Sequence, residues 1–233
     1  MNDDIISIAF NCLSFSKECT LEAKQHVAKL ISIIFKFPQV QKKLMESADL
    51  ETEEGDVSDV KIVRGICDLL EQVNHMDIIR YTIKSCTYIS MNYKFIKDAR
   101  FSKDILKQMM KLLDQMTGRN DKYNIILTIK NILKGDKVNK DYFLMNGGTK
   151  MFMDIILESN DFQMIEMCVQ GIMEQARYKK FMIKVIGNKE LLGQLKTVIK
   201  KALDITEDWM HDVNQRDFEK EKKRIVNGKS IEL

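Results

Sequence analysis

Proline is almost absent from this sequence of 233 residues: Pro38 is the only one, and glycine occurs only ten times. Both residues interrupt helices and fill tight turns, so a protein built from many short strands would need more of them. Their scarcity favours long helices joined by short polar turns. The composition, 45% hydrophobic and 30% charged, also excludes a disordered tail, a collagen-like chain and a membrane-embedded chain.

The sequence also lacks a strong excess of charge of either sign. Lys and Arg total 37 against 34 Asp and Glu, which gives a formal net charge of +3. A whole-chain field this weak neither attracts nor repels nucleic acid strongly. Any electrostatic recognition must therefore come from a local group of charges.

Signals of secretion and of membrane insertion are missing too. Residues 1–4 carry no positive charge, which a signal peptide would need there, and the longest apolar stretches are too short to span a bilayer. The cysteines are odd in number and scattered, as is typical of reduced, buried thiols: Cys12, Cys19, Cys67, Cys86 and Cys168. We expect a soluble cytoplasmic protein without membrane insertion; the cytoskeleton and the cilium are candidate locations, and a nuclear location stays open.

No motif points to catalysis, to a cofactor or to a metal. His26, His75 and His211 lie far apart, and none belongs to an H-E-x-x-H pair. Residues 228–230 (Gly-Lys-Ser) look like the end of a phosphate-binding loop, but the earlier glycine is missing. Residues 147–150 (Gly-Gly-Thr-Lys) are better explained as a turn between helices. We therefore expect a protein that is not an enzyme, with no catalytic, cofactor-binding or metal-binding residues.

An apolar motif recurs every 43 residues along the chain. Each copy places apolar residues at positions i, i+3 and i+4, which lie on one face of a helix. The four copies are Ile66, Leu69 and Leu70; Met109, Leu112 and Leu113; Phe152, Ile155 and Ile156; and Leu195, Val198 and Ile199. This regular spacing predicts an internal helical repeat.

A second apolar stripe lies between successive copies of the first. Its copies, separated by 46 and then 40 residues, are Ile79, Ile83 and Cys86; Ile125, Ile129 and Ile132; and Ile165, Val169 and Ile172. Asn-Asp pairs at 120–121 and 160–161 stand where an Asn or Asp side chain would cap the new helix. A shorter apolar element precedes copies of the first stripe at residues 93–96, 142–145 and 180–183. Each unit thus contains one short and two longer helices.

Residues 142–176 carry a family resemblance. Residues 143–148 (Phe-Leu-Met-Asn-Gly-Gly) resemble the first helix of an armadillo repeat with its terminal glycine, residues 151–157 resemble the second helix, and residues 165–176 resemble the third. By periodicity the resemblance to armadillo and HEAT repeats extends over residues 62–203. It implies an all-α, right-handed α-solenoid of about five armadillo-like repeats, each burying its apolar stripes against its neighbours. A non-repetitive helical bundle is the alternative.

The two ends and one insertion differ from these repeats. The segment from Glu46 to Asp59 has seven acidic residues and no basic one, which is typical of a solvated loop, either for solubility or as a docking site for a basic surface. Pro38 is expected to end a helix over residues 23–37. Trp209 is interpreted as a lid on the last repeat or as an end contact for a partner. The predicted parts are a degenerate capping repeat (1–47), an acidic loop insertion (48–60), armadillo-like repeats (61–204), and a C-terminal capping helix with a charged tail (205–233).

The resemblance also implies a concave groove along the third helices. Armadillo proteins that carry nuclear import signals present tryptophans there, with asparagines four positions on. In this chain the tryptophan positions fall at Lys84, Lys130 and Gln170, with Lys29 in the degenerate unit, and the asparagine positions fall at Tyr88, Lys134 and Glu174. Both ladders are missing, which argues against an import carrier for basic signals. The aligned lysines, with little local acid, either bind acidic segments or form an ordinary solvated surface.

These patterns favour a non-catalytic protein–protein interaction scaffold. By resemblance it would be an adaptor or a structural subunit of a larger assembly, such as a cytoskeletal or axonemal complex. One alternative is a transient adaptor that binds acidic peptides or tails through the lysine-lined groove. A nucleic-acid-associated helical repeat protein is a weaker alternative, because arginines and aromatic residues are not interleaved as base stacking would require.

Overall fold

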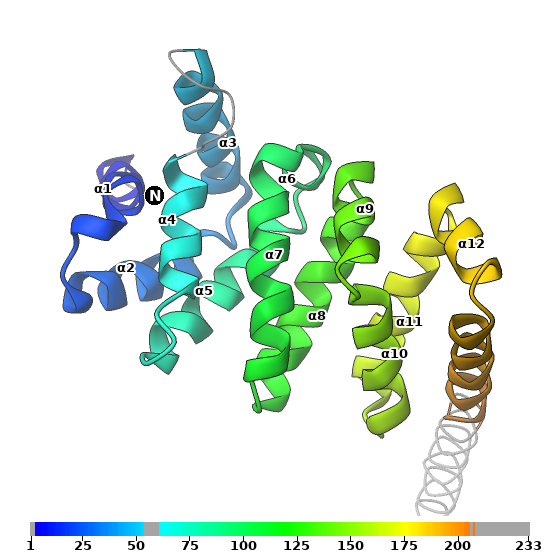
Figure 1. Cartoon of the computed structure of the whole chain (residues 1–233). Coiled ribbons are helices and arrows are strands. Elements are labelled where there is room, and N and C mark those ends of the chain that lie inside the picture. Colours follow the sequence, from blue (N-terminus) through cyan, green and yellow to red (C-terminus); the bar gives the residue numbers. More distant parts are fainter. Residues whose placement is uncertain (1–2, 54–60, 206, 208–233) are drawn as a thin grey trace, which may run out of the picture.

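Every regular element in the described part of the chain is a helix. The computed structural model describes residues 3–53, 61–205 and 207, and within them the predicted all-α fold is confirmed (Figure 1). The helices are α1 (Asp3–Ser14), α2 (Leu21–Ile34), α3 (Pro38–Glu53), α4 (Lys61–Leu70), α5 (Met76–Ile89), α6 (Tyr93–Lys97), α7 (Ala99–Gln115), α8 (Arg119–Leu133), α9 (Lys137–Met145), α10 (Gly148–Glu158), α11 (Phe162–Ala176) and α12 (Lys179–Ile186), with a 3-10 turn η1 (Ser16–Glu18). Residues 189–205 form a further helix.

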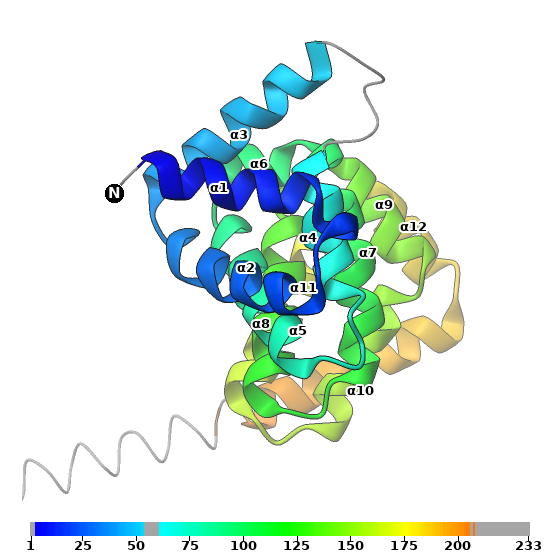
Figure 2. The ribbon, with the colours of Figure 1, turned by 90° about the vertical axis from the view of Figure 1, so that its left-hand side faces the viewer.

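The helices stand side by side in a row that runs from α1 at one end to the helix at 189–205 at the other (Figure 1). On one side of the row α1 packs on α4 and α4 on α7; on the other side α2 packs on α5, α5 on α8 and α8 on α11. The view along the row shows α1 and α2 in front of the later helices (Figure 2). Helices that carry the predicted apolar stripes therefore pack against one another in sequence along the row.

Polar contacts between residues about 40 positions apart recur along the row. The separations run from 37 to 44 residues, close to the predicted motif spacings of 40, 43 and 46 residues. The contacts join Glu71 with Gln108, Thr87 with Thr128, Ser102 with Asn139, Lys130 with Gln170, Asp141 with Tyr178, and Leu157 with Lys201. Helices that are distant in the sequence are thus joined by side-chain hydrogen bonds as well as by apolar packing.

Both predicted stripes lie in the core, and the last copy of the first stripe is the exception. The copies of the first stripe on α4, α7 and α10 are buried, except that Ile155 is half-buried. The copies of the second stripe on α5, α8 and α11 are also buried, except that Val169 is half-buried. In the copy on helix 189–205, Val198 is buried but Ile199 is 51% exposed. No described helix follows this one to cover its outer side.

One of the two predicted helix caps is confirmed. The Asp161 carboxylate caps α11 by accepting hydrogen bonds from the backbone N–H groups of Gln163 and Met164. The prediction for residues 120–121 is wrong, because α8 begins at Arg119 and Gly118 is its N-cap residue. Asp121 instead accepts a hydrogen bond from Arg80 of α5, at 3.1 Å.

The acidic segment is not a loop throughout. Helix α3 begins at Pro38 and continues to Glu53, so the predicted loop at residues 48–60 is wrong up to Glu53. Glutamate, alanine and leucine favour helices, and this preference outweighs the repulsion between the carboxylates. Pro38 begins a helix, where its missing N–H costs nothing, while α2 already ends at Ile34. Residues 54–60, Trp209 and the predicted charged tail lie outside the described residues.

Two glycines allow helices and turns to touch through their backbones. A Cβ atom on Gly65 of α4 would lie 2.0 Å from the carbonyl oxygen of Leu13 in α1. At Gly135, which follows α8, it would lie 1.9 Å from the carbonyl oxygen of Ile96 in α6. A larger residue at either position would force the two elements apart.

All five cysteines are free thiols, as predicted. Cys86 and Cys168 are buried, and the other three are half-buried. Burial, reinforced by the Asp104 and Glu71 charges, raises the pKa of Cys67 to about 12. This thiol therefore stays protonated and is a poor nucleophile at neutral pH. Among the described helices, none is long and apolar enough to cross a membrane.

Candidate partner-binding surfaces

The predicted groove residues lie on the four helices that pack in sequence on one side of the row. They are Lys29 on α2, Lys84 and Tyr88 on α5, Lys130 with Lys134 just after it at the end of α8, and Gln170 and Glu174 on α11. The structure brings the α8 and α11 members together, because Lys130 Nζ donates a hydrogen bond of 3.3 Å to Gln170 Oε1. Lys29 and Lys84 are exposed on their own helices.

Lys130 occupies the centre of this region and is only 7% exposed. Burial lowers the pKa of its ammonium group, and the positive charge of Lys134 lowers it further. The carboxylates of Glu166 and Glu174 act in the opposite direction. Lys130 therefore packs its aliphatic stem and keeps its charge next to polar groups of α11.

The expectation of little acid near the lysines is wrong at the α11 end. Glu166 and Glu174 both act electrostatically on Lys130. Gln170 Nε2 donates to Glu166 Oε1 at 3.0 Å, and Arg177 donates to both oxygens of Glu174 at 3.1 and 3.2 Å. The positive charge of the predicted groove is thus partly neutralised where α8 meets α11.

Half-buried apolar and aromatic side chains accompany these charges, and of these the sequence analysis named only Tyr88. Their positions on α5, α8 and α11 are separated by 46 and then 40 residues, as are the copies of the second apolar stripe. Applying these two offsets to the exposed side of the helices, as well as to the buried side, would have found them. We call this surface the α5–α8–α11 face; its members are spaced i, i+4, i+7 and i+11: Asp77, Tyr81, Lys84 and Tyr88; Tyr123, Leu127, Lys130 and Lys134; Gln163, Met167, Gln170 and Glu174.

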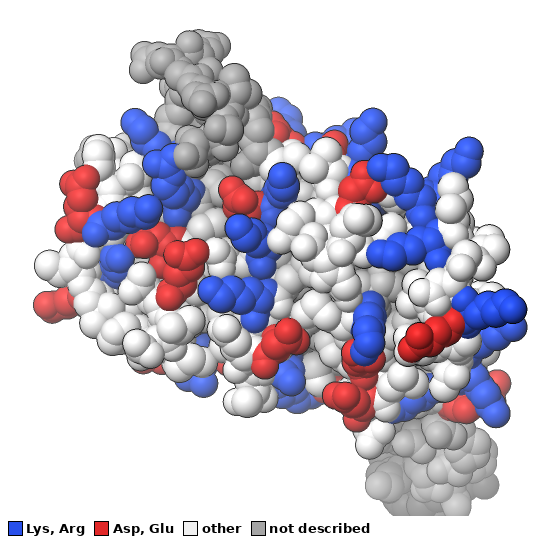
Figure 3. Space-filling view, in the orientation of Figure 1, with Lys and Arg blue, Asp and Glu red and all other residues white. Residues whose placement is uncertain are grey.

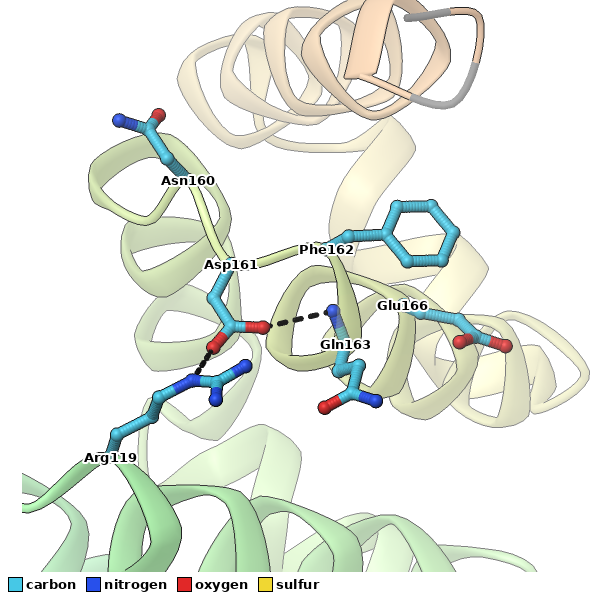
Figure 4. A pocket seen from close by; sticks show the side chains of 6 residues that line it. All are labelled: Arg119, Asn160, Asp161, Phe162, Gln163 and Glu166. Atoms are coloured by element: carbon cyan, nitrogen blue, oxygen red, sulfur yellow. Dashed lines mark hydrogen bonds and ion pairs between the residues drawn. The ribbon is translucent and has the colours of Figure 1, made fainter. Parts of the chain in front are cut away.

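A polar pocket lies where the beginnings of α8 and α11 meet (Figure 4). Its lining residues are Arg119, Asn160, Asp161, Phe162, Gln163 and Glu166. Figure 4 shows the Arg119 guanidinium directed at the Asp161 carboxylate, which also accepts from the Gln163 backbone. These groups hold the two helices together, and their charges are already paired with each other.

An apolar groove opens at the far end of the row, between α11, α12 and the helix at 189–205. Its volume is about 460 Å³. We call it the C-terminal groove; its lining residues are all apolar: Val169, Ile172, Met173, Ala176, Phe181, Met182, Val185, Ile186, Leu192, Leu195, Val198, Ile199, Ala202 and Leu203. Contiguous exposed apolar surface of this kind usually marks a contact with another molecule.

The α4–α7–α10 side of the row carries no patch dominated by one sign of charge. Figure 3 shows Lys and Arg interspersed with Asp and Glu on that side. Within the described residues, no three or more His, Cys, Asp or Glu side chains come together in a way that could hold a metal ion. The surfaces that stand out are thus the α5–α8–α11 face and the C-terminal groove.

Comparisons with protein-family models, with curated proteins and with solved structures found no match to this chain.

Proposed function

We propose that this protein is a non-catalytic protein–protein interaction scaffold, acting as an adaptor or structural subunit of a larger assembly. Its row of helices would be a right-handed α-solenoid of about five armadillo-like repeats. The recurrence of polar contacts at separations of 37 to 44 residues supports a repeat of about this length. A cytoskeletal or axonemal assembly in the cytoplasm is one setting for such a subunit.

The observation that carries the proposal is the composition of the α5–α8–α11 face. Three tyrosines, Leu127 and Met167 are half-buried there, next to the polar cluster around Lys130. Tyrosine and methionine are enriched at protein interfaces, because they provide large contact areas at modest entropic cost. Because Lys130 and Gln170 are already hydrogen-bonded, part of this surface is ordered before a partner arrives.

A transient adaptor for acidic segments is the second candidate, favoured by the exposed Lys84 and Lys134. Against it stand Glu166 and Glu174, which place negative charge beside Lys130. The two candidates differ in salt dependence, since the screening length falls to about 3 Å at 1 M salt. An adaptor that depends on exposed charge pairs would release its partner, whereas an apolar interface would keep it.

The test is affinity purification of the tagged full chain from cells that make it, followed by quantitative mass spectrometry at 0.15 and 1 M salt. We expect a stoichiometric partner that resists 1 M salt and is lost from the variant Tyr123→Ala/Leu127→Ala. Val138→Ala, at an exposed apolar position on α9, is the matched control and should keep the partner. A partner released by salt and by Lys84→Glu/Lys134→Glu, but kept by Tyr123→Ala/Leu127→Ala, would favour the acidic-segment adaptor.

A further inference from the structure

The short helices α6, α9 and α12 lie one after another along one edge of the row (Figure 1). The backbone N–H of Asp136, just before α9, donates a hydrogen bond to the carbonyl oxygen of Ile96 in α6, at 3.3 Å. Lys184 of α12 donates through Nζ to the carbonyl oxygen of Leu144 in α9, at 3.0 Å. The three helices therefore form one continuous surface, which we call the short-helix edge.

Positive charge is concentrated on the short-helix edge. Its three helices contain seven lysines and a single acidic residue, Asp141, whereas the rest of the chain carries a slight excess of acidic groups. The Asp141 carboxylate is already engaged, because it accepts hydrogen bonds from Tyr178 Oη at 2.7 Å and from Lys180 Nζ at 2.8 Å. Figure 3 shows Lys and Arg side chains projecting along this upper edge. A local positive field therefore exists despite the weak net charge of the whole chain.

Helix α12 places an exposed apolar side chain among its lysines. Phe181 and Val185 are buried against the rest of the protein, whereas Ile183, on the opposite face, is 62% exposed. Ile183 follows the exposed Lys179 by four positions and the exposed Lys180 by three, so these side chains share the outer face of the helix. An isoleucine at the centre of a basic outer face has no role in the core of the protein.

The other two short helices show the same combination. On α9, Val138 and Met145 are both exposed, Met145 by 74%, and they lie two turns apart on the face that also carries Lys137. Beside α6, Met91 is 60% exposed, and Lys94 in the first turn of the helix is exposed as well. Single exposed apolar residues are common on protein surfaces, but their recurrence beside lysines on three neighbouring helices indicates a binding surface.

We propose that the short-helix edge binds the surface of a membrane that contains anionic lipids. The negative potential of such a surface attracts lysine ammonium groups. Aliphatic side chains on the same helix faces leave water by entering the boundary between head groups and acyl chains. The flexible lysine stems keep their charges at the level of the head groups, while Met145 and Ile183 lie deeper. The protein lies on the bilayer and does not cross it.

A nucleic acid or an acidic protein segment fits this edge less well. Nucleic acids are bound mainly through arginine and stacked aromatic rings, and the three short helices contain no arginine. A phosphate backbone would also leave Met145 and Ile183 without an apolar environment. An acidic segment would need apolar residues of its own at matching positions, whereas a fluid bilayer offers both environments along the whole edge. None of these helices belongs to the α5–α8–α11 face, so this inference does not depend on the proposed function.

Charge reversal at one lysine of each short helix tests the electrostatic part of the proposal. The full chain is floated with vesicles of phosphatidylcholine that contain about 30% phosphatidylserine, at about 0.15 M salt. We expect the wild type to float with these vesicles and not with pure phosphatidylcholine vesicles. The variant Lys94→Glu/Lys137→Glu/Lys179→Glu should bind at least tenfold more weakly. A wild type that stays with neither kind of vesicle would overturn the proposal.

A matched variant separates the edge from the charge of the whole chain. Lys29→Glu/Lys84→Glu/Lys111→Glu changes the net charge by the same amount, at exposed positions on α2, α5 and α7. It should bind phosphatidylserine vesicles like the wild type. An equal loss of binding in the two triple variants would show that only the total charge matters, which contradicts a specific edge.

Removal of the exposed aliphatic side chains tests the membrane as the occupant. Met145→Ser/Ile183→Ser leaves every charge in place and should bind phosphatidylserine vesicles at least fivefold more weakly. Ile8→Ser/Ile33→Ser, at positions 58% and 48% exposed on α1 and α2, is the control and should bind like the wild type. Unchanged binding of Met145→Ser/Ile183→Ser, or wild-type binding to duplex DNA or polyglutamate but not to the vesicles, would refute a membrane partner. All the substituted side chains are exposed, so each variant should keep the helical circular dichroism of the wild type.

Discussion

Arg119, the first residue of α8, forms an ion pair with Asp161, the residue that caps α11. One helix earlier, Arg80 of α5 pairs with Asp121 in the first turn of α8, with 3.1 Å between Nε and Oδ2. In both cases a guanidinium of one helix reaches a carboxylate at the beginning of the next. These pairs fix the relative position of successive helices on the side of the row that carries the α5–α8–α11 face.

Removal of the Asp161 side chain should destabilise the fold more than removal of its partner. Asp161→Ala deletes the cap, because the backbone N–H groups of Gln163 and Met164 lose their acceptor, and it deletes the ion pair as well. We expect a loss of about 1–2 kcal/mol in the free energy of unfolding by urea. Arg119→Ala leaves the cap in place and removes only the ion pair, whose arginine side chain is 66% exposed, so its loss should be smaller. A larger loss for Arg119→Ala would contradict this assignment.

The same carboxylate should produce a specific dependence of stability on pH. The hydrogen bond from Arg119, assisted by the backbone N–H groups of α11, holds the pKa of Asp161 below its usual value. The contribution of the ionised Asp161 carboxylate to the free energy of unfolding is therefore complete above the unfolded-state pKa of about 4. It is lost as the pH falls through the lower folded-state pKa. Asp161→Asn should be less stable than the wild type at pH 7, and the difference should vanish near pH 2. A difference that stays constant between these pH values would exclude the ionised carboxylate as its origin.

The sequence predicts the helices that bury regular stripes. Ile66, Met109 and Phe152 recur at one spacing and are all buried, because each helix of a row must present the same kind of face to its neighbours. The start of α8 is different. Glycine and asparagine both cap helices, so the sequence does not decide between Gly118 and Asn120 as the residue before α8. The contact between Arg80 and Asp121, which are 41 residues apart, depends on how α5 lies against α8. That arrangement is tertiary and leaves no local signal.

The candidate surface is predictable in part for the same reason. The repeat offset aligns Lys130 with Gln170, and the structure joins them by a hydrogen bond. The neutralising effect of Glu166 and Glu174 depends on distances between helices, which spacing along the chain does not provide. Helix α3 shows a further limit, since its glutamates have high helix propensity but also repel one another, and composition alone does not decide between the two effects.

A methyl group at Gly65 should loosen α1 from α4. In Gly65→Ala the new Cβ would meet the Leu13 carbonyl oxygen at 2.0 Å, so one helix must move. We expect thermal unfolding to report a loss of about 1–3 kcal/mol. Gly193→Ala is the matched control, because this glycine is also helical but no atom lies within 4 Å of its new Cβ. The control should gain up to about 1 kcal/mol, and equal losses at the two positions would contradict the close contact between α1 and α4.

Gln175 should be a site where a less polar side chain stabilises the protein. It is fully buried on α11, and among the described residues neither its amide nitrogen nor its amide oxygen has a hydrogen-bond partner. A buried polar group without a partner has lost its hydrogen bonds to water without replacing them, and this desolvation cost destabilises the fold. Methionine, which has a similar length and no amide group, would remove the cost. Gln175→Met should therefore raise the free energy of unfolding by about 1–3 kcal/mol, whereas Gln163→Met, at an exposed position of the same helix, should change it by less than about 0.5 kcal/mol. A destabilised Gln175→Met with a neutral control would mean that the amide makes a specific polar contact in solution.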